Sequence, residues 1–530
     1  MKHTTKLLAL LLAAAMMLGL AACGGSTSAP ASTAQPAASA PASSEAPAES
    51  SEPAPAEKKD SLTVAFTSEP PSLTTCDHDS LISVGLNMMT FNGLTKVNME
   101  TLAIELDLAE SYEIENDVEW IFHLKKGVKF HNGQEMTADD VVASLEYAKS
   151  VPASVNYTQN WEKVEKIDDY TVKITTPQPY AGTLADLSFH FNFILPKELI
   201  ENGHNFNEEP IGTGPYKLVE WVSGDHLTFE KNDDYFDEAH KPSIKTIKFE
   251  IIPEGASRAI ALETGKVDFV WELNAADAGA VKDNSSIYID EVNSVDNVNL
   301  FMNQDKAPYN DVNFRRAIAA AINREDIIMG ALNGYGMVNY ACISQGYPET
   351  TDEDAIVYDP AKAQEYFDAW GGDPSSVTME INVSNETRVN IATIIQNNLK
   401  PFGINVKVNF LDTATYFDRW DTGNYDALIA SWSPATSMMY VNRYTTARRQ
   451  QYPGSYNNPD IDPLLADMAS TLDDAERAEK IRNIIKIVNA DIPQISLYQS
   501  VWLRAYNSNL KGVVCSGTGY AYYNDMYWGD

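Results

Sequence analysis

Few groupings in this sequence combine the residue types and the spacing that a catalytic or metal site needs. The chain contains no G-x-S-x-G, no H-E-x-x-H and no G-x-x-x-x-G-K-S/T motif, so we assign no activated nucleophile, no zinc-protease helix and no phosphate loop. Asp77-His78-Asp79 offers three ligand-type side chains in a row, but no second His or Cys cluster stands at ligand spacing. We interpret these three residues as a solvated loop, and we predict no catalytic residue, no metal and no cofactor.

The residue with a predicted covalent modification is Cys23. Residues 1–22 begin with positive charge and continue as an apolar run, Leu7 to Leu20, which is too short to span a bilayer comfortably and is typical of a lipoprotein signal peptide. The run ends in LAACG at 20–24, which resembles a bacterial lipobox. In such signals the Cys sulfur receives a diacylglycerol and becomes the new N-terminus after cleavage. The alternative is an ordinary signal peptide with an incidental Cys.

Residues 23–60 lack the apolar periodicity that a folded core requires, because nearly all of them are Ser, Ala, Pro, Thr, Gly or Glu. We predict a disordered tether, whose flexible part of about 36 residues would reach on the order of 30–35 Å on average. Acyl chains of the palmitate type on Cys23 would anchor the protein stably, since two or more chains hold a membrane where one does so marginally. These features predict an extracytoplasmic lipoprotein, anchored to the cell membrane on the outer face of the plasma membrane or in the periplasm.

The length and composition predict more than one folded lobe and exclude some partners. With 530 residues, of which 44% are hydrophobic, the chain is longer than a single core usually grows. The 74 acidic residues against 39 basic ones give a net charge of −35, which argues against nucleic acid and against an anionic lipid surface as direct partners. We interpret the charge as a determinant of solubility. Once Cys23 is lipidated, Cys76, Cys342 and Cys515 allow at most one disulfide, so no disulfide framework is predicted.

Residues 108–149 predict strands, turns and a helix around which the rest of the chain is organised. Residues 119–124, EWIFHL, alternate in the way expected of a half-buried strand. A second strand is expected over residues 128–130, followed by a tight turn at Asn132-Gly133, since both of these residues tolerate positive φ. Thr137 is then expected to cap a helix with an apolar stripe.

The same stretch carries a family resemblance. Its order LAES…FHLKKGVKFHNGQ…TADDVVASLE closely resembles the signature of the solute-binding proteins of ABC importers, family 5, which includes the oligopeptide, dipeptide and nickel binders. Further segments match the family in the same order along the chain. They are PIGTGPY at 210–216, WVSGDHLTFEKNDDYF at 221–236, ASRAIALETGKVDF at 256–269, Arg315-Arg316 with Ala317-Ile318, and PFGINV at 401–406. The ordered set spans essentially everything from Ser61 to Asp530.

The resemblance implies an α/β, two-lobed fold of the periplasmic-binding-protein type (type II, the large cluster C type) with an inserted subdomain in the first lobe. On this pattern residues 61–297 form lobe 1 with its inserted subdomain, residues 298–498 form lobe 2, and residues 499–530 return to lobe 1. The first crossover between the lobes is expected near residues 295–303. Such proteins close around a ligand by hinge motion, and the transporter recognises the closed form.

The resemblance also points to one part of the ligand site. In the peptide-binding members, an Asp soon after a Trp in the second lobe pairs with the α-amino group of the ligand. This sequence has the Trp as Trp432, but Ala435 stands near the place of the Asp. The Arg and Tyr of dipeptide binders are also missing, and the loop at 384–388 replaces them. Because a buried ammonium without a carboxylate is costly, either another acid such as Glu69 or Glu386 substitutes, or the ligand is not an ordinary dipeptide.

The predicted ligand contacts are aromatic side chains and a few directed polar groups, as small-ligand sites usually offer. They are Trp432, Asn385, Arg388, Arg443, Tyr498, Glu69 and Trp161. The guanidinium groups of Arg388 and Arg443 could each hold a carboxylate bidentately. For every one of these residues the alternative role is packing in the core or on the surface.

The resemblance implies a membrane-anchored solute-binding component of an ABC importer, monomeric, that captures short peptides and delivers them to the transmembrane permease subunits. An alternative within this class is a binder of a non-peptide solute, such as a nickel chelate or a small metabolite. A second alternative is a ligand-sensing lipoprotein that presents its ligand to a receptor. A third, a secreted lipoprotein enzyme, is disfavoured because the sequence contains no catalytic grouping.

Overall fold

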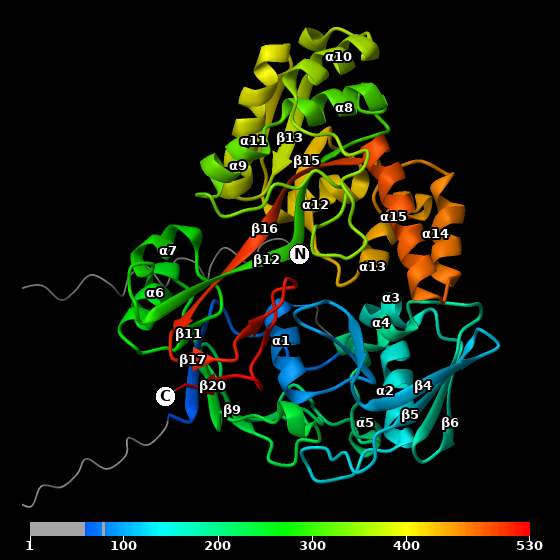
Figure 1. Cartoon of the computed structure of the whole chain (residues 1–530), viewed down its shortest axis with the longest axis vertical. Helices are drawn as coiled ribbons and strands as arrows, with labels where there is room; N and C mark the ends of the chain where they lie inside the picture. The colour runs from blue at the N-terminus through cyan, green and yellow to red at the C-terminus, as the bar shows by residue number, and fades with distance from the viewer. Residues whose placement is uncertain (1–58, 77–79, 530) are drawn as a thin grey trace, which may run out of the picture. The chain divides into compact units, whose positions relative to one another are not determined.

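The computed structural model describes residues 59–76 and 80–529, all of which belong to one compact unit. This part of the chain has the two-lobed α/β architecture that the resemblance implied (Figure 1). Several sequence predictions lie outside the described residues: the signal peptide at 1–22, the lipidation site Cys23, nearly all of the tether at 23–60, and the loop Asp77-His78-Asp79.

A ten-stranded sheet runs through both lobes, in the order β14-β13-β15-β12-β16-β11-β1-β10-β9-β8. Its strands are, in chain order, β1 (Ser61–Phe66), β8 (Tyr216–Val222), β9 (His226–Lys231), β10 (Thr246–Ile251), β11 (Phe269–Val270), β12 (Ile287–Met302), β13 (Thr378–Val383), β14 (Asn405–Phe410), β15 (Ala427–Trp432) and β16 (Gln494–Asn507). Strand β1 pairs in parallel with β10 and β11, and β13 does so with β14 and β15. Strands β8, β9 and β10 pair antiparallel, and a short turn joins β8 to β9.

Two long antiparallel strands, β12 with 16 residues and β16 with 14, connect the lobes. At one end β12 also pairs with β15, and at the other end β16 also pairs with β11. The register of β12 on β16 shifts between Asn293 and Asn297 and again between Val298 and Asn299, so bulges interrupt the ladder near its middle. Figure 1 shows the two strands running side by side from one lobe into the other. The crossing is therefore a hydrogen-bonded strand pair and not a pair of free linkers.

Lobe 1 is built on the β1 end of the large sheet. The side chains of Leu62, Val64 and Phe66 are buried in a core that also contains Tyr523 and Met526 from the end of the chain. The remaining elements of this end of the sheet are α1 (Leu81–Thr90), α6 (Gly255–Glu263), α7 (Ala275–Val281), β17 (Leu510–Lys511), β18 (Val514–Cys515), β19 (Ala521–Tyr522) and β20 (Tyr527–Trp528). The last residues of the chain thus pack against its first strand.

A separate four-stranded antiparallel sheet, β4-β5-β7-β6, lies within the same lobe. It comprises β4 (Ala109–Glu115), β5 (Glu119–Leu124), β6 (Lys163–Asp168) and β7 (Thr171–Thr175), covered by α2 (Ala138–Ser150). Burial alternates along β5 as predicted, and Thr137 is the N-cap of α2, with its backbone N–H donating to the Asp140 carboxylate at 2.9 Å. The strand predicted over residues 128–130 is wrong. Only an isolated bridge between Lys129 and Glu135 forms there, because β4 and β7 already occupy both edges of β5.

Short elements lie in the connections within and between the two sheets of lobe 1. They are β2 (Thr95–Val97), β3 (Ile104–Leu106), η1 (Pro152–Ser154), α3 (Val155–Thr158), α4 (Thr183–Leu187), η2 (His190–Asn192), α5 (Lys197–Glu201) and η3 (Glu238–His240). Being short, they place individual side chains next to one another that are far apart in the sequence.

The glycine-rich turn PIGTGPY fixes the C-terminal end of α1. A Cβ on Gly212 would lie 2.2 Å from the Thr90 carbonyl oxygen, and a Cβ on Gly214 would lie 2.5 Å from the Met89 carbonyl oxygen, so neither position has room for a side chain. The backbone N–H of His131 donates to the Gly212 carbonyl at 2.8 Å, and the His131 ring is 3.0 Å from the Gly214 carbonyl through Nε2. Two sequence segments that carry the family resemblance therefore meet in space.

Lobe 2 surrounds the other end of the large sheet with helices. They are α8 (Val312–Ala321), α9 (Arg324–Ala331), α10 (Pro360–Trp370), η4 (Pro374–Ser376), α11 (Glu386–Leu399), η5 (Lys400–Phe402), α12 (Thr413–Thr422), α13 (Ser437–Asn442), η6 (Thr446–Gln450), α14 (Ile461–Ser470) and α15 (Asp474–Asp491). Helices α8 to α11 each begin at a polar side chain that accepts a hydrogen bond from the backbone of the first turn. These caps are Asp311, Asn323, Asp359 and Asn385.

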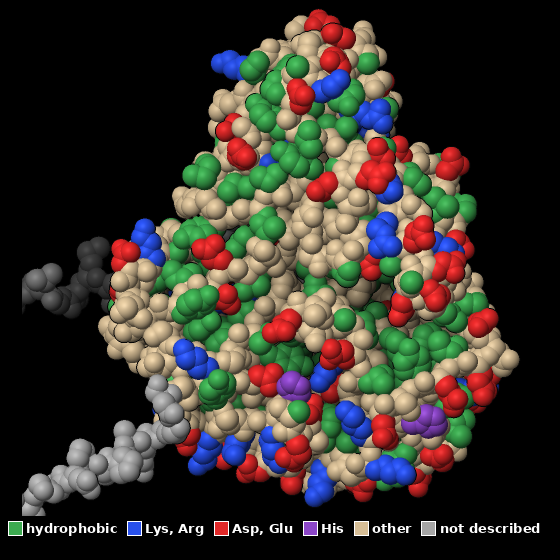
Figure 2. Space-filling model, in the orientation of Figure 1, with side chains coloured by type: hydrophobic (Ala, Val, Ile, Leu, Met, Phe, Trp, Pro, Cys, Tyr) green, Lys and Arg blue, Asp and Glu red, His purple; other side chains and the backbone are tan. Residues whose placement is uncertain are grey.

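The surface carries the excess negative charge in dispersed form. Acidic side chains are spread over the face shown in Figure 2, with basic side chains among them. This distribution agrees with the interpretation of the net charge as a determinant of solubility. Within residues 59–76 and 80–529, no helix is both long enough and apolar enough to cross a membrane.

Candidate functional site

A cavity of about 960 Å³ lies between the lobes. Lobe 1 lines it with α1, β2, the segments around α3 and α4, and η2. Lobe 2 lines it with the end of β15 and the residues that follow, through α13 to η6. The C-terminal part of the chain contributes a third group of lining residues, namely Trp502, Thr518, Tyr520 and Tyr522. A concave space of this size, lined by aromatic and polar side chains, is typical of a small-ligand site.

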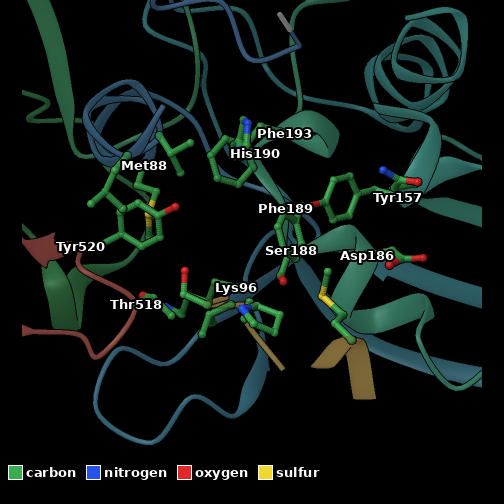
Figure 3. A pocket seen from close by; sticks show the side chains of 18 of the residues that line it. Met88, Lys96, Tyr157, Asp186, Ser188, Phe189, His190, Phe193, Thr518 and Tyr520 are labelled. Carbon is green, nitrogen blue, oxygen red and sulfur yellow. The ribbon is translucent and has the colours of Figure 1, made fainter. Parts of the chain in front are cut away.

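Aromatic side chains cover much of the lobe 1 wall. Tyr157, on α3, stacks on Phe189 with ring centroids 4.1 Å apart and an interplanar angle of 26°. In Figure 3 Tyr157 and Asp186 lie on one side of the view, whereas Met88 and Tyr520 lie on the opposite side, and Lys96 projects between them. Such a wall offers flat apolar surfaces on which the body of a ligand can pack.

A buried carboxyl group also belongs to the lobe 1 wall. Asp186, on α4, is only 4% exposed, and its neighbours are the Tyr180 hydroxyl and the Asn160 side chain. Burial raises the pKa of Asp186 well above the usual range of a carboxyl group, and the hydrogen bonds from Tyr180 and Asn160 oppose this shift only in part. Its Oδ2 atom has no hydrogen-bond partner in the described part of the chain. The carboxyl group can therefore accept a cationic partner that enters the cavity.

A second acid on this wall is already partnered. Asp107 accepts a hydrogen bond from the Asn92 side chain at 2.8 Å, and the Lys96 ammonium lies 3.8 Å from its other oxygen. Burial raises the pKa of Asp107, while the charge of Lys96 opposes that shift. Lys96 is shared with Asp237, also at 3.8 Å, so the positive charge in this corner is balanced by two carboxylates.

A third acid lies where β12 crosses between the lobes. Asp296 lines the cavity and accepts a hydrogen bond from the Ser500 hydroxyl of β16 at 2.8 Å. Burial raises the pKa of Asp296, and the hydrogen bonds from Ser500 and Ser431 together with the charge of Arg388 act in the opposite direction. Asp296 therefore links the two crossing strands to the floor of the cavity.

The lobe 2 wall has the opposite charge. Trp432, the last residue of β15, has the Arg443 guanidinium over its ring at 4.8 Å and the Arg448 guanidinium at 5.6 Å. All three residues line the cavity. The Trp432 indole N–H and the Arg443 Nη1 are buried and have no hydrogen-bond partner among the described residues. Buried donors of this kind usually have a partner, so these two are available to a ligand.

Of the contacts predicted from the sequence, the structure brings Trp432 and Arg443 to the cavity. Arg388 and Asn385 do not line it, since Asn385 caps α11 by accepting a hydrogen bond from the Arg388 backbone N–H at 2.9 Å. The side chain of Arg388 lies within hydrogen-bonding distance of Ser384, at 3.4 Å, and its charge acts on Asp296, which does line the cavity. Arg388 is thus close to the site without being part of its lining.

The structure does not bring Tyr498, Glu69 or Trp161 to the cavity, and each has a different structural role. Tyr498 is buried in the lobe 2 core, and Trp161 is buried in the core of the four-stranded sheet. Glu69 accepts a hydrogen bond from the Gly224 backbone N–H at 2.9 Å and others from Ser223 and Trp221, which together lower the pKa of its carboxyl group. Glu386, the other acid considered as a substitute, lies in the first turn of α11 and is likewise outside the lining.

Sequence reasoning missed most of the lobe 1 wall. Tyr157, Asp186, Phe189 and Lys96 come from four short segments, and no local pattern marks any of them as a ligand contact. A buried Asp in a five-residue helix is a usable signal only once the burial is known. Their convergence depends on contacts between short elements, of α4 with β2 and α3 and of η2 with α1.

The site contains no arrangement suited to covalent or metal chemistry. Among the described residues, no group of three or more His, Cys, Asp or Glu side chains could hold a metal ion. Cys342 and Cys515 are free thiols, and burial raises the pKa of Cys342 to about 12 and that of Cys515 to about 11. The two thiols therefore stay protonated at neutral pH.

Comparison with known proteins agrees with this picture of a binding cavity. The sequence model of the family described as bacterial extracellular solute-binding proteins, family 5 middle, matches residues 103–452. The probable D,D-dipeptide-binding periplasmic protein DdpA of Escherichia coli is 29% identical over 480 residues, which cover 87% of this chain and 92% of that protein. The oligopeptide-binding protein AppA of Bacillus subtilis is 28% identical over 490 residues, which cover 85% of this chain and 88% of that protein.

Solved structures show the same fold. AppA of Bacillus subtilis in complex with a nonapeptide covers 89% of this chain and 99% of its own, with a TM-score of 0.70 and 25% identity. NikZ of Campylobacter jejuni in complex with Ni(L-His) covers 88% of this chain and 99% of its own, with a TM-score of 0.71 and 25% identity. These relatives are binding proteins and not enzymes. The chain belongs to the bacterial extracellular solute-binding proteins of family 5, and it is the solute-binding component of an ABC importer.

Proposed function

We propose that this protein captures short peptides outside the cell and delivers them to the transmembrane permease subunits of its importer. The observation that carries the proposal is the cavity of about 960 Å³, which has carboxyl groups on the lobe 1 wall and guanidinium groups on the lobe 2 wall. A short peptide has a positive and a negative end and an amide backbone, which suit such a cavity. The names of DdpA and AppA as dipeptide-binding and oligopeptide-binding proteins support the same ligand class.

The test is to identify what the purified protein carries. Full-length protein is purified gently, its mass is measured under native conditions, and it is then denatured so that released molecules can be identified. We expect a set of short peptides that stabilise the emptied protein when they are added back, because a ligand that binds only the folded state raises the melting temperature. A single non-peptide mass, with no stabilisation by peptides, would contradict the proposal.

The same proposal includes two further points: the two lobes close around the ligand, and the protein acts as a monomer. The moving bodies are residues 61–297 with 499–530, and residues 298–498, joined by β12 and β16. Closure should reduce the radius of gyration in small-angle scattering when ligand is added, while the mass stays that of one chain. An unchanged radius with saturating ligand would contradict hinge closure, and a doubled mass would contradict the monomer.

We further propose that acyl chains on Cys23 anchor the protein and that residues 23–60 act as its tether. The support is the LAACG segment at the end of an apolar run. Mass spectrometry of the N-terminal peptide should find a diacylglyceryl group on Cys23, and Cys23→Ala should release the protein from the membrane fraction. An unmodified N-terminus at another residue would contradict the anchor.

A second candidate ligand class is a metal chelate or another small metabolite. The observation that favours it is Ala435, which lines the cavity beside Trp432 where a carboxylate for a peptide ammonium was expected. NikZ, with its bound Ni(L-His), is a relative that holds such a chelate. Elemental analysis of the purified protein detects a nickel chelate, since a peptide ligand leaves no stoichiometric nickel, and the mass of the released molecule distinguishes a metal-free metabolite from a peptide.

A further inference from the structure

The lobe 2 wall holds two guanidinium groups around a single ring. Besides Trp432, Arg443 has the Phe301 ring at 5.1 Å and the Tyr440 ring at 5.9 Å, and Arg448 has the Tyr452 ring at 5.6 Å. Aromatic faces hold a guanidinium by its plane and leave its N–H groups at the edge free to donate. The two side chains are therefore positioned by stacking, with their donors left for something else.

Neither of these guanidinium groups has a carboxylate partner in the described part of the chain. Other arginines of lobe 2 do: Arg419 pairs with Glu380 at 2.7 Å, and Arg449 pairs with Asp305. Arg448 donates to the Gln451 side chain at 2.7 Å, and Nη1 of Arg443 is buried with no partner. Burial, and to a smaller extent the charge of Arg443, lower the pKa of Arg448. Two like charges thus face one cavity wall without compensation.

Such an arrangement is unfavourable when the cavity is empty and favourable when an anion enters. A buried cation without a partner loses hydration and gains nothing in exchange. A carboxylate placed against two guanidinium groups accepts several charge-assisted hydrogen bonds, which are about twice as strong as neutral ones. Ala435, Ser431 and Ser433, which complete this wall, add no negative charge that would oppose an anion. Asp296 accepts a hydrogen bond from Ser431, and burial raises its pKa, which favours its neutral form.

We propose that Arg443 and Arg448, stacked on Trp432, form a carboxylate subsite that fixes one end of the ligand against lobe 2. The acids of the cavity then face the rest of the ligand, so that a zwitterionic ligand lies with its negative end on lobe 2 and its positive end toward Asp186 on lobe 1. This inference rests on the proposed function for the identity of the ligand as a peptide. The recognised chemistry, a carboxylate, is independent of that identity.

The first test uses succinate, a small dicarboxylate, as the probe on the full-length protein after removal of bound ligand. Succinate should raise the melting temperature relative to sodium chloride of equal ionic strength. Arg443→Gln and Arg448→Gln should each abolish the rise, with unchanged melting temperatures in chloride as the sign that both variants fold. Arg449→Gln is the matched control, because Arg449 lies next to Arg448 in the sequence but pairs with Asp305 outside the cavity lining. It should retain the rise.

The second test compares one pool of tri- to pentapeptides prepared with free carboxyl ends and as carboxamides. The wild type should prefer the free acids by roughly 10- to 100-fold, the range expected for hydrogen bonds to a charged group. Arg443→Gln and Arg448→Gln should lose this preference, because their affinity for the free acids should fall toward their affinity for the carboxamides.

The two tests separate the subsite from the peptide function. A succinate effect without binding of either pool keeps the subsite and overturns the peptide ligand. Equal binding of acids and carboxamides, with no succinate effect, keeps the peptide ligand and overturns the subsite. Failure of both tests overturns both. Loss of acid and carboxamide binding to the same extent in the variants would show that the arginines act on the structure of the wall and not on a carboxylate.

Discussion

The two walls of the cavity differ in how the chain builds them. Apart from Ala469, the lobe 2 wall comes from one continuous stretch, from Ser431 to Arg448, and carries the guanidinium groups. The lobe 1 wall is assembled from several short segments, between α1 and η2, and carries Asp186 and Asp107 with most of the aromatic side chains. The difference indicates that the lobe 2 wall depends on fewer separate segments of the chain than the lobe 1 wall does. It also gives the cavity a direction, from carboxyl groups on lobe 1 to guanidinium groups on lobe 2.

The largest effect is expected on the lobe 2 wall, from Trp432→Ala. Removing the ring deletes an apolar surface and the support of two guanidinium groups, so affinity for the released ligand should fall by about 2–4 kcal/mol, the range of interface hot spots. Calorimetric titration measures it.

The matched control for that prediction is Trp370→Ala. Trp370 is also in lobe 2, where its ring centroid lies 5.0 Å from that of Phe314, but it does not line the cavity. Its removal should leave affinity unchanged. Equal losses of affinity in the two variants would show that ligand binding depends on the packing of lobe 2 in general and not on the Trp432 ring.

The free energy of unfolding should depend on pH through His131, which lies in lobe 1 and does not line the cavity. Burial lowers the pKa of His131 to about 4 from an ordinary value of 6.5. Between pH 6.5 and pH 4 the unfolded chain therefore binds more protons than the folded chain. The contribution of the neutral His131 ring to the free energy of unfolding is complete above pH 6.5 and is lost as the pH falls toward 4. The loss is at most about 3 kcal/mol. Denaturant unfolding at pH 7 and pH 5 checks it.

The control for the pH effect uses two histidines. His131→Gln should flatten the dependence of unfolding free energy on pH, because the replacement cannot be protonated. His123→Gln should retain the dependence, since His123 is exposed beside Glu113 at 3.4 Å. Flattening in both variants would assign the effect to the surface charge of lobe 1.

A smaller effect on affinity is expected at the lobe 1 wall, from Asp186→Asn. Burial raises the pKa of Asp186, so a ligand ammonium that stabilises the ionised form should displace a proton on binding. Affinity should then rise with pH, and Asp186→Asn should lower it by roughly tenfold, as for a lost hydrogen bond to a charge. Titrations in two buffers of different ionisation enthalpy measure the released proton. Equal heats in both buffers would remove Asp186 as the cation partner.

The smallest effect is expected from Glu69→Gln. The carboxylate of Glu69 accepts the Gly224 N–H and the Ser223 hydroxyl, so its loss should lower the melting temperature and change affinity by less than about twofold. Thermal unfolding and titration on the same sample give both values. A tenfold loss of affinity would show that Glu69 contacts the ligand, and the carboxyl groups of the lobe 1 wall would then not be the only acids that determine affinity on that side.

The same contrast explains how much could be predicted from the sequence. The two-lobed fold was predicted from the ordered segments that resemble the family, and elements within them could be predicted because their signals are local: the alternation of β5, the cap at Thr137 and the turn at Gly212 each depend on a few adjacent residues. Trp432 was predicted from the same resemblance, and both it and Arg443 line the cavity, although their contact with a ligand stays a prediction. The strand over residues 128–130 was wrong because strand formation needs a free partner edge, which the sequence of one segment does not reveal.

The lobe 1 wall could not be predicted, for a physical reason. Asp186 is a ligand group only because Tyr180, Asn160 and the neighbouring chain bury it, and that burial arises from segments far apart in the sequence. Glu69 and Trp161 were chosen as an acid in a loop and an aromatic side chain. The hydrogen bonds of Glu69 with residues 221–224, and the place of Trp161 in the core, become visible only in three dimensions.

The paired strands β12 and β16 have a consequence for the speed and cost of ligand capture. A hydrogen-bonded ribbon resists stretching and sliding but bends and twists where its register is interrupted, here between Asn293 and Asn299. A paired ribbon of this kind allows the lobes fewer mutual orientations than two flexible chains would. For the proposed closure, part of the orientational entropy that two separate bodies would lose on docking is then already lost when the protein folds.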